Sequence, residues 1–306
     1  MKKKFLLTLA CLSLACQSLS ADCYDSYCDN DCFGFDSVLT FDVGGGYRRD
    51  ELKWKTFPSY DPGRQIEERW QNVGIGIIEA NAQFLACEHF LLKVDFDYGW
   101  FTKSGSQKYF ADGGIQENIN YKSTPKGNVY DLSGGLGYQF NFDCTRISFA
   151  PLAGYSYHQQ RFKSRVYTNV FLPASEKILA HNDYKFRWSG PWVGFALAYQ
   201  ASCELQLFVD YYYHWARFRG TVKEHFAFSL GGLPSHLRSN RAYGNEFRCG
   251  GIYTFCDFWY VGVEFDYKQF CGNKGKSIVE NIDAVSALRS LDWKSSTLTL
   301  NIGYEF

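Results

Sequence analysis

The sequence predicts an all-β protein, a transmembrane antiparallel up-and-down β-barrel of about ten strands. Residues 293–306 alternate apolar and polar side chains and end on an aromatic residue. Aromatic residues make up 19% of the chain, which has 28 glycines and only 7 prolines. Segments of alternating hydrophobicity are joined by connections that are alternately short and long. Outer-membrane barrels have this asymmetry, because their periplasmic turns are shorter than their external loops.

The final stretch has the clearest alternation. Leu298, Leu300, Ile302, Tyr304 and Phe306 share one parity, and the residues between them are polar or small. Such alternation indicates a strand with one apolar and one polar face. It resembles the closing strand of a bacterial outer-membrane barrel, and this resemblance implies that Tyr304 and Phe306 form the barrel-assembly signal. The alternative is the edge strand of a soluble β-sandwich.

The amino-terminal residues predict export. Three lysines, an apolar run over 5–15 and small residues up to Ala21 have the pattern of a signal peptide, residues 1–21. Cys11 and Cys16 lack the upstream Leu of a lipoprotein signal. We expect a periplasmic Cys-rich segment over 22–35 and one barrel domain over 36–306, in the outer membrane. After the signal, no apolar run approaches the ~20 residues of a membrane helix. The net charge of zero gives no indication of nucleic acid.

The alternation divides the barrel into ten expected strands. They cover about 37–49, 70–86, 90–101, 129–142, 146–167, 183–200, 205–220, 243–255, 259–270 and 293–306. Tight turns are expected at 87–89, 143–145, 201–204 and 256–257, and long loops between the other strands. In the second strand, Val73, Ile75 and Ile77 share the parity of Glu79, which predicts a bulge near Ile77 and Ile78.

Charged and polar residues on the inward parity predict a polar lumen, because a carboxylate that faced hydrocarbon would be several kcal/mol unfavourable. They are Lys93, Asp95, Asp97, Asp210, His214, Arg248, Glu264, Asp266 and Lys268. We expect them to set the selectivity for small polar solutes or ions; the alternative is that they pair with one another. Ten strands make a narrow lumen, which numerous inward small residues such as Gly135, Gly154 and Gly194 would widen.

The cysteines have an unusual distribution. Cys87, Cys144, Cys203 and Cys256 each fall in a tight turn, whereas Cys23, Cys28 and Cys32 lie near the amino terminus. These seven thiols would face the oxidising periplasm, where disulfides form. Local bridges and intermolecular bridges both remain possible, and the odd number favours the latter. A metal site is not expected, because turns spread around a rim are too far apart for one tetrahedral ion. No cofactor is expected.

The size, signal, cysteine usage and terminal Phe resemble the Protochlamydia-type outer membrane protein family. This resemblance implies a chlamydial envelope in which disulfides cross-link outer-membrane proteins, and a family that includes porins. The expected partners are outer-membrane lipid and lipopolysaccharide, the barrel-assembly machinery, disulfide-linked envelope proteins and small polar solutes.

A second resemblance is to the omptins, ten-stranded outer-membrane endoproteases. It is carried by LAGYSYHQQRF at 152–162, YKFRWSGPWVGF at 184–195 and the Gly99-Trp100 pair. The omptin Asp-x-His dyad falls on Lys223-Glu224-His225, so His225 with Glu224 is a weak catalytic candidate. Lys223 stands where the Asp should be and cannot accept the imidazole N–H. Asp95 and Asp97 have the spacing of the omptin Asp pair but lie deeper. We therefore expect no protease activity.

These observations predict a porin-like channel for small polar solutes, tied by disulfides on its periplasmic face. The first alternative is a disulfide cross-linked structural barrel without a conducting lumen. The second is an omptin-like endoprotease with a rearranged site.

Overall fold

The chain forms one closed antiparallel β-barrel. The computed structural model describes residues 37–58, 65–103, 106–111, 119–122, 126–142, 145–168, 178–225, 234–256, 258–279 and 284–306. The strands are β1 (Val38–Pro58), β2 (Ile66–Ala86), β3 (Phe90–Lys103), β4 (Ser106–Ala111), β5 (Ile119–Lys122), β6 (Lys126–Tyr138), β7 (Phe140–Phe142), β8 (Ile147–Thr168), β9 (Ile178–Gln200), β10 (Leu205–His225), β11 (Pro234–Cys256), β12 (Trp259–Val279) and β13 (Ala284–Glu305). The expected signal peptide and Cys-rich segment lie outside the described residues.

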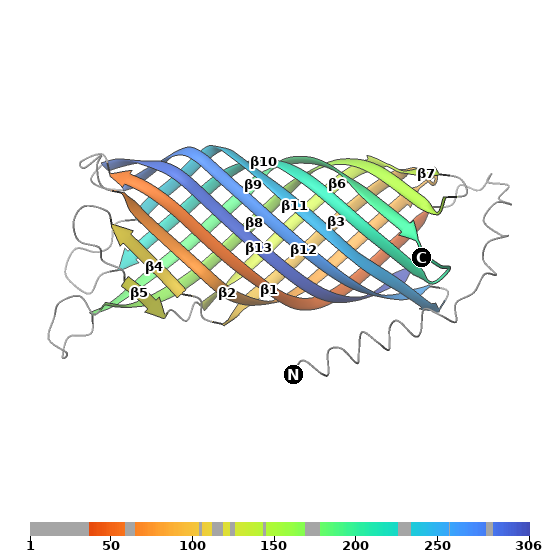
Figure 1. Cartoon of the computed structure of the whole chain (residues 1–306), viewed down its shortest axis with the longest axis horizontal. Helices are drawn as coiled ribbons and strands as arrows, with labels where there is room; N and C mark the ends of the chain where they lie inside the picture. Colours follow the sequence, from red (N-terminus) through yellow and green to blue (C-terminus); the bar gives the residue numbers. More distant parts are fainter. Residues whose placement is uncertain are drawn as a thin grey trace.

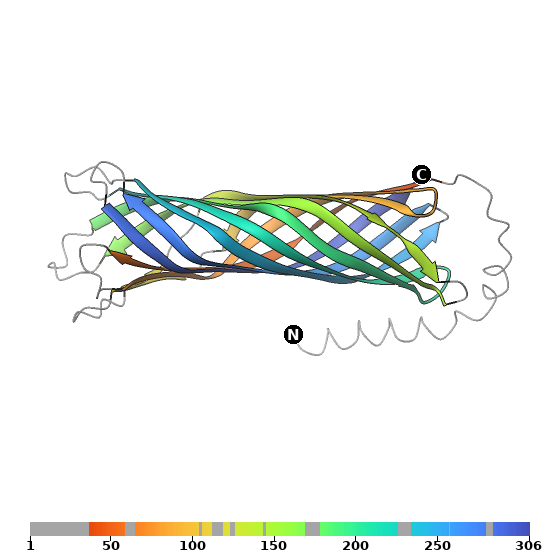
Figure 2. The same cartoon turned by 90° about the horizontal axis from the view of Figure 1, so that it is seen from above.

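These strands make ten positions around the wall. β3 and β4 both pair with β2, and β5 to β7 together occupy the next position. β1 pairs with both β2 and β13, which closes the barrel. The strands are inclined to the long axis, and the carboxyl terminus lies at the end with the short turns (Figure 1). A view turned by 90° shows the same elongated barrel (Figure 2). The predicted ten-stranded fold is confirmed.

The closing strand has the predicted alternation. β13 pairs with β1 from Thr40 opposite Glu305 onward, and the Phe306 N–H donates to the Leu39 carbonyl at 2.8 Å. Leu298, Leu300 and Ile302 are exposed on the outer face. A closed wall leaves no strand edge unpaired, which hydrocarbon requires because it offers no partner to a backbone N–H or C=O. None of the described segments is a helix long and apolar enough to cross a membrane.

The strands are longer than the sequence analysis predicted. Residues 50–58, 221–225, 234–241, 271–279 and 284–291 were expected in loops, but they continue the barrel wall. Apolar and polar residues still alternate in these parts, but the apolar residues face inward and the charged residues face outward. Leu52 and Trp54 are buried inside, while Lys53 and Lys55 lie outside. Their charged outer face gave the sequence the polar character of a loop.

The predicted bulge near Ile77 and Ile78 is wrong. The register of β2 is regular there, and it shifts instead between Gly74 and Ile75 against β3, and between Asp50 and Leu52 of β1. Val73, Ile75 and Ile77 point inward in phase with Glu79, and all four are buried. No change of phase is needed, because this end of the interior is apolar.

Candidate functional site in the barrel interior

The nine predicted lumen residues lie inside the barrel, where Lys93 pairs with Asp210 and the other seven belong to an ion-pair network around Arg248 and Lys268. Lys93 Nζ lies 2.7 Å from Asp210 Oδ2, and Arg248 Nη1 lies 3.0 Å from Asp95 Oδ1. Lys268 contacts four carboxylates at 2.9–3.6 Å, those of Asp266, Asp97, Asp131 and Glu246. The charged lumen residues thus pair with one another, as the alternative interpretation of the sequence had it. Their role in selecting solutes or ions stays a prediction.

Five further buried residues belong to this network and were missed in the sequence. They are Arg48, Asp50, Asp131, His158 and Glu246. The Arg48 guanidinium donates to both carboxylate oxygens of Asp50 at 2.8 and 3.0 Å and to Asp131 at 2.8 Å. Such forked contacts are the strong kind of charge-assisted hydrogen bond. The signal that could have found them is inward parity: Arg48 alternates with the outward Tyr47, and Glu246 with the outward Phe247.

An aromatic cluster fills the interior beyond this network, toward the long loops. Trp70 meets Phe162 with ring centroids 4.9 Å apart, and Phe162 stacks on Tyr184 at 4.9 Å. The contacts continue from Phe186 to Phe218 at 5.8 Å, from Phe218 to Trp188 at 4.7 Å, and from Trp188 to Trp293 at 6.1 Å. The cluster thus joins strands around the barrel. A cavity of about 10 Å³ between it and Asp50 is roughly the size of one water.

The inward glycines do not widen the lumen as expected. A Cβ built on Gly135 or Gly154 would meet the Trp192 ring at 2.4 Å, and one on Gly194 would meet Tyr212 at 2.6 Å. Trp192 and Tyr212 are buried with Leu152 in a second apolar cluster, nearer the short turns. The glycines make room for these rings, so the interior is occupied on both sides of the charged network.

The omptin-like candidates do not assemble into a catalytic site among the described residues. Asp95 and Asp97 pair with Arg248 and Lys268. Glu224 and His225 end β10, opposite Asn182 and His181 of β9 in register, and their side chains lie outside the described residues. The absence of protease activity stays a prediction, based on Lys223.

The cysteines divide into three groups. Cys87 is exposed with a free thiol in the turn between β2 and β3, at a left-handed φ of 51°. Cys203, in the turn before β10, is disulfide-bonded. Cys249 and Cys271 are free and half-buried in the wall. Cys23, Cys28, Cys32, Cys144 and the side chain of Cys256 lie outside the described residues, so the predicted pattern of bridges stays a prediction.

The outer wall carries a row of cations beyond the apolar belt. The belt comprises the exposed Val, Leu, Ile, Phe, Tyr and Trp side chains near the short turns. Above it, Arg187, Arg219, Arg238 and Lys276 stand directly opposite one another on β9, β10, β11 and β12. Like charges directly opposite across strands are destabilising. No acidic side chain pairs with these four among the residues that the structure describes.

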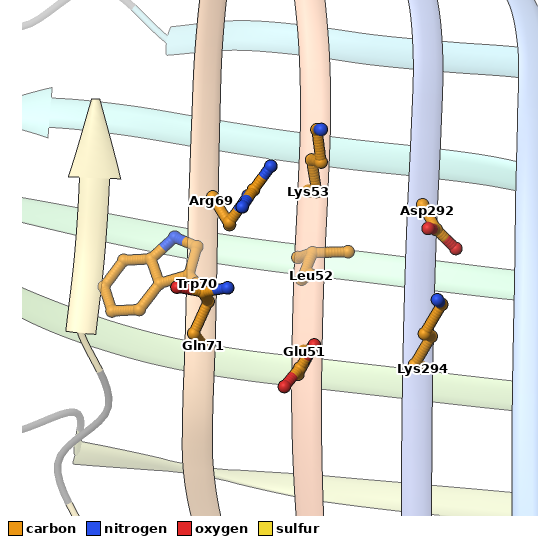
Figure 3. A pocket seen from close by; sticks show the side chains of 8 residues that line it. All are labelled: Glu51, Leu52, Lys53, Arg69, Trp70, Gln71, Asp292 and Lys294. Carbon is orange, nitrogen blue, oxygen red and sulfur yellow. The ribbon is translucent and has the colours of Figure 1, made fainter. Parts of the chain in front are cut away.

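A shallow pocket of about 230 Å³ lies on β1, β2 and β13, lined by Glu51, Leu52, Lys53, Arg69, Trp70, Gln71, Asp292 and Lys294 (Figure 3). Beside it, Glu67 accepts from Lys53, Lys55 and Arg69 at 3.0–3.1 Å. Burial acts to raise the pKa of Glu67, but hydrogen bonds from Lys55 and Lys53 outweigh it and hold the pKa below its usual value. Because Lys53 and Arg69 of the pocket lining already pair with Glu67, the pocket indicates no particular ligand.

Comparisons with known proteins agree with this architecture. The sequence model of the family described as Pom, Protochlamydia outer membrane protein, matches residues 42–306. The outer membrane protease OmpT from Escherichia coli is similar in structure, with a TM-score of 0.71 and 12% identity over 91% of this chain and 99% of that one. A Pseudomonas aeruginosa FadL homologue reaches a TM-score of 0.38 at 10% identity, over 88% and 90%. No curated protein matches. At such identities the likeness to OmpT shows the fold alone.

Removing the central cation should destabilise the barrel strongly. We expect Lys268→Met to lower the free energy of unfolding by about 3–5 kcal/mol, because it leaves several buried carboxylates without their partner. The matched control is Lys276→Met on the same strand, which is exposed and should change the free energy by less than about 0.5 kcal/mol. Urea unfolding in zwitterionic vesicles, followed by Trp fluorescence, measures both. Equal effects would contradict the central role of Lys268.

Proposed function

The chain belongs to the Protochlamydia outer membrane protein family, and on this basis we propose that it is a structural barrel of the outer membrane with a closed interior. In this proposal, disulfides at its short turns link it to copies of itself or to other envelope proteins. The observation that carries the proposal is the filled interior. The aromatic cluster, the ion-pair network and the cluster around Trp192 follow one another along the barrel axis.

The porin-like channel expected from the sequence is the competing function. A solute would have to separate Arg48 from Asp50 and Asp131, and Lys268 from its carboxylates, and then pass the aromatic cluster. Breaking one buried ion pair is unfavourable by several kcal/mol. Small barrels are commonly filled by their own side chains, whereas general porins use sixteen or more strands. The interior therefore supports the structural role better than conduction.

Planar-bilayer recording separates these two functions. We expect the refolded mature chain to give no discrete conductance steps, with or without reductant, because its interior is filled. The change in gel mobility between folded and heated samples verifies that the recorded barrel is folded. Discrete steps whose ion preference changes in Asp95→Asn or Asp97→Asn would establish the channel instead.

The disulfide part of the proposal is supported by Cys87, the exposed free thiol in a turn. We expect reductant-sensitive complexes on gels of envelopes trapped with N-ethylmaleimide, which reductant collapses to one chain of 35.2 kDa or slightly less. Cys87→Ser should deplete these complexes, whereas Cys249→Ser should not, because Cys249 lies within the wall of β11. A single monomer band without reductant would contradict cross-linking.

We also propose that the cation row binds phosphate groups of lipopolysaccharide at the membrane surface. Phosphates would relieve the repulsion among these four side chains, and a cation near an anionic surface contributes about 1 kcal/mol. The double variant Arg219→Gln, Arg238→Gln should therefore weaken binding of lipopolysaccharide about 30-fold. The control double variant Arg49→Gln, Lys163→Gln removes the same charge, but both residues already have acidic neighbours, Glu51 and Asp183.

Titration of detergent-solubilised barrel with labelled lipopolysaccharide measures both double variants. Equal weakening would show that only net charge matters and would contradict a specific row.

A further inference from the structure

We infer that His158, His214 and Glu246 form a binding site for a divalent transition-metal ion of the zinc class inside the barrel. The three residues come from β8, β10 and β11 and are each 1% exposed. Each offers one ligand atom, and these atoms lie within 4.8 Å of one another. Two imidazoles and one carboxylate are a donor set typical of zinc, with a fourth position left for water.

His158 supplies the independent observation. Neither of its ring nitrogens makes a hydrogen bond, although the side chain is buried. An unpartnered buried polar group is unfavourable, and a metal ion would satisfy Nε2. Nδ1 lies 3.3 Å from Asp131 Oδ1, which also lacks a hydrogen bond. A metal-bound histidine commonly donates its second N–H to a carboxylate, and Asp131 stands where it could accept that hydrogen bond.

Glu246 and His214 are already oriented for this role. Glu246 Oε1 accepts from Arg248 at 2.8 Å, so this oxygen is occupied, and Oε2 lies 3.1 Å from His214 Nε2. His214 Nδ1 lies 3.0 Å from the Ser156 hydroxyl, which leaves Nε2 facing the carboxylate. An ion would replace the His214–Glu246 contact with two coordinate bonds.

The charge of the interior also favours an additional cation. Eleven inward carboxylates that are buried or half-buried face four permanent cations, Arg48, Lys93, Arg248 and Lys268. The carboxylates are Asp42, Asp50, Glu68, Glu79, Asp95, Asp97, Asp131, Asp210, Glu246, Glu264 and Asp266. Lys268, 3.6 Å from Glu246, opposes an ion, but Asp266, Asp97 and Asp131 surround its ammonium. On the other side, Phe270 and Trp293 pack on His158 with ring centroids 5.1 and 5.7 Å away.

Zinc binding to the full mature chain tests the site. The chain is refolded in detergent with its thiols alkylated, so that cysteines cannot bind metal, and is then dialysed against zinc and measured by elemental analysis. We expect one zinc per folded barrel and a rise in the midpoint of thermal unfolding. His158→Gln and His214→Asn should each lose the bound zinc, and Asp131→Asn should weaken binding 10–100-fold.

The matched control is His89→Gln, because His89 lies in the turn between β2 and β3, away from the cluster, and its Nδ1–H donates to the Gln139 backbone carbonyl. It should keep one zinc. Gel mobility verifies that each variant folds, and Asp131→Asn keeps the test valid should a histidine variant fail to fold. A folded wild-type barrel without zinc, or the same zinc content in His158→Gln, would overturn the inference.

Discussion

Closure of the wall is the constraint on which the rest of this structure depends. A strand in hydrocarbon must pair all its backbone groups, so the wall has to return to β1, and it does so through β13. Closure creates an interior only ten strands in circumference, and each inward side chain meets others from the opposite wall. The interior is thereby filled with whatever the inward parity of each strand supplies. In this chain the inward residues are charged side chains at one height along the barrel axis and aromatic side chains at the next.

The two faces of the wall exchange character at about the same height. On β1 the inward series changes from Arg48 and Asp50 to Leu52 and Trp54, while the outward series changes from Tyr47 to Arg49. On β12 the inward change falls between Lys268 and Phe270, after the outward Phe265. Beside lipid, polar groups can lie only inside. Beyond the belt, the outer face is charged and the apolar side chains lie inside, as in a soluble barrel. The same alternation of inward and outward side chains therefore continues along each strand, both within the apolar belt and beyond it.

This exchange explains how much of the fold and site the sequence could predict. The tight turns at 87–89 and 201–204 and the outward apolar residues of the belt were predictable, since period-two alternation is local. The strand extensions and the inward orientation of Ile75 were not predictable. When the whole lumen is assumed to be polar, a row of inward apolar residues is interpreted as a loop or as a bulge. Filling of the interior was missed for another reason: Trp192 reaches Gly135 and Gly154 only through neighbouring strands. His214 and Glu246 lie on the paired strands β10 and β11, whereas His158 comes from β8, two positions along the wall, so the sequence spacing does not show that the three meet.

The ion pairs that cross the interior connect strands that are not neighbours in the wall. Arg48 of β1 reaches Asp131 of β6, Lys93 of β3 reaches Asp210 of β10, and Arg248 of β11 reaches Asp95 of β3. Buried ion pairs contribute little net stability, because desolvation offsets the attraction between the charges. They do penalise a shift of register, since a slip by one residue would turn each charge toward lipid. Trp293 joins the two levels, because its ring lies under the Arg48 guanidinium at 5.3 Å and its N–H donates to Asp50. The network thus fixes the register of the wall, which agrees with the structural role that we propose.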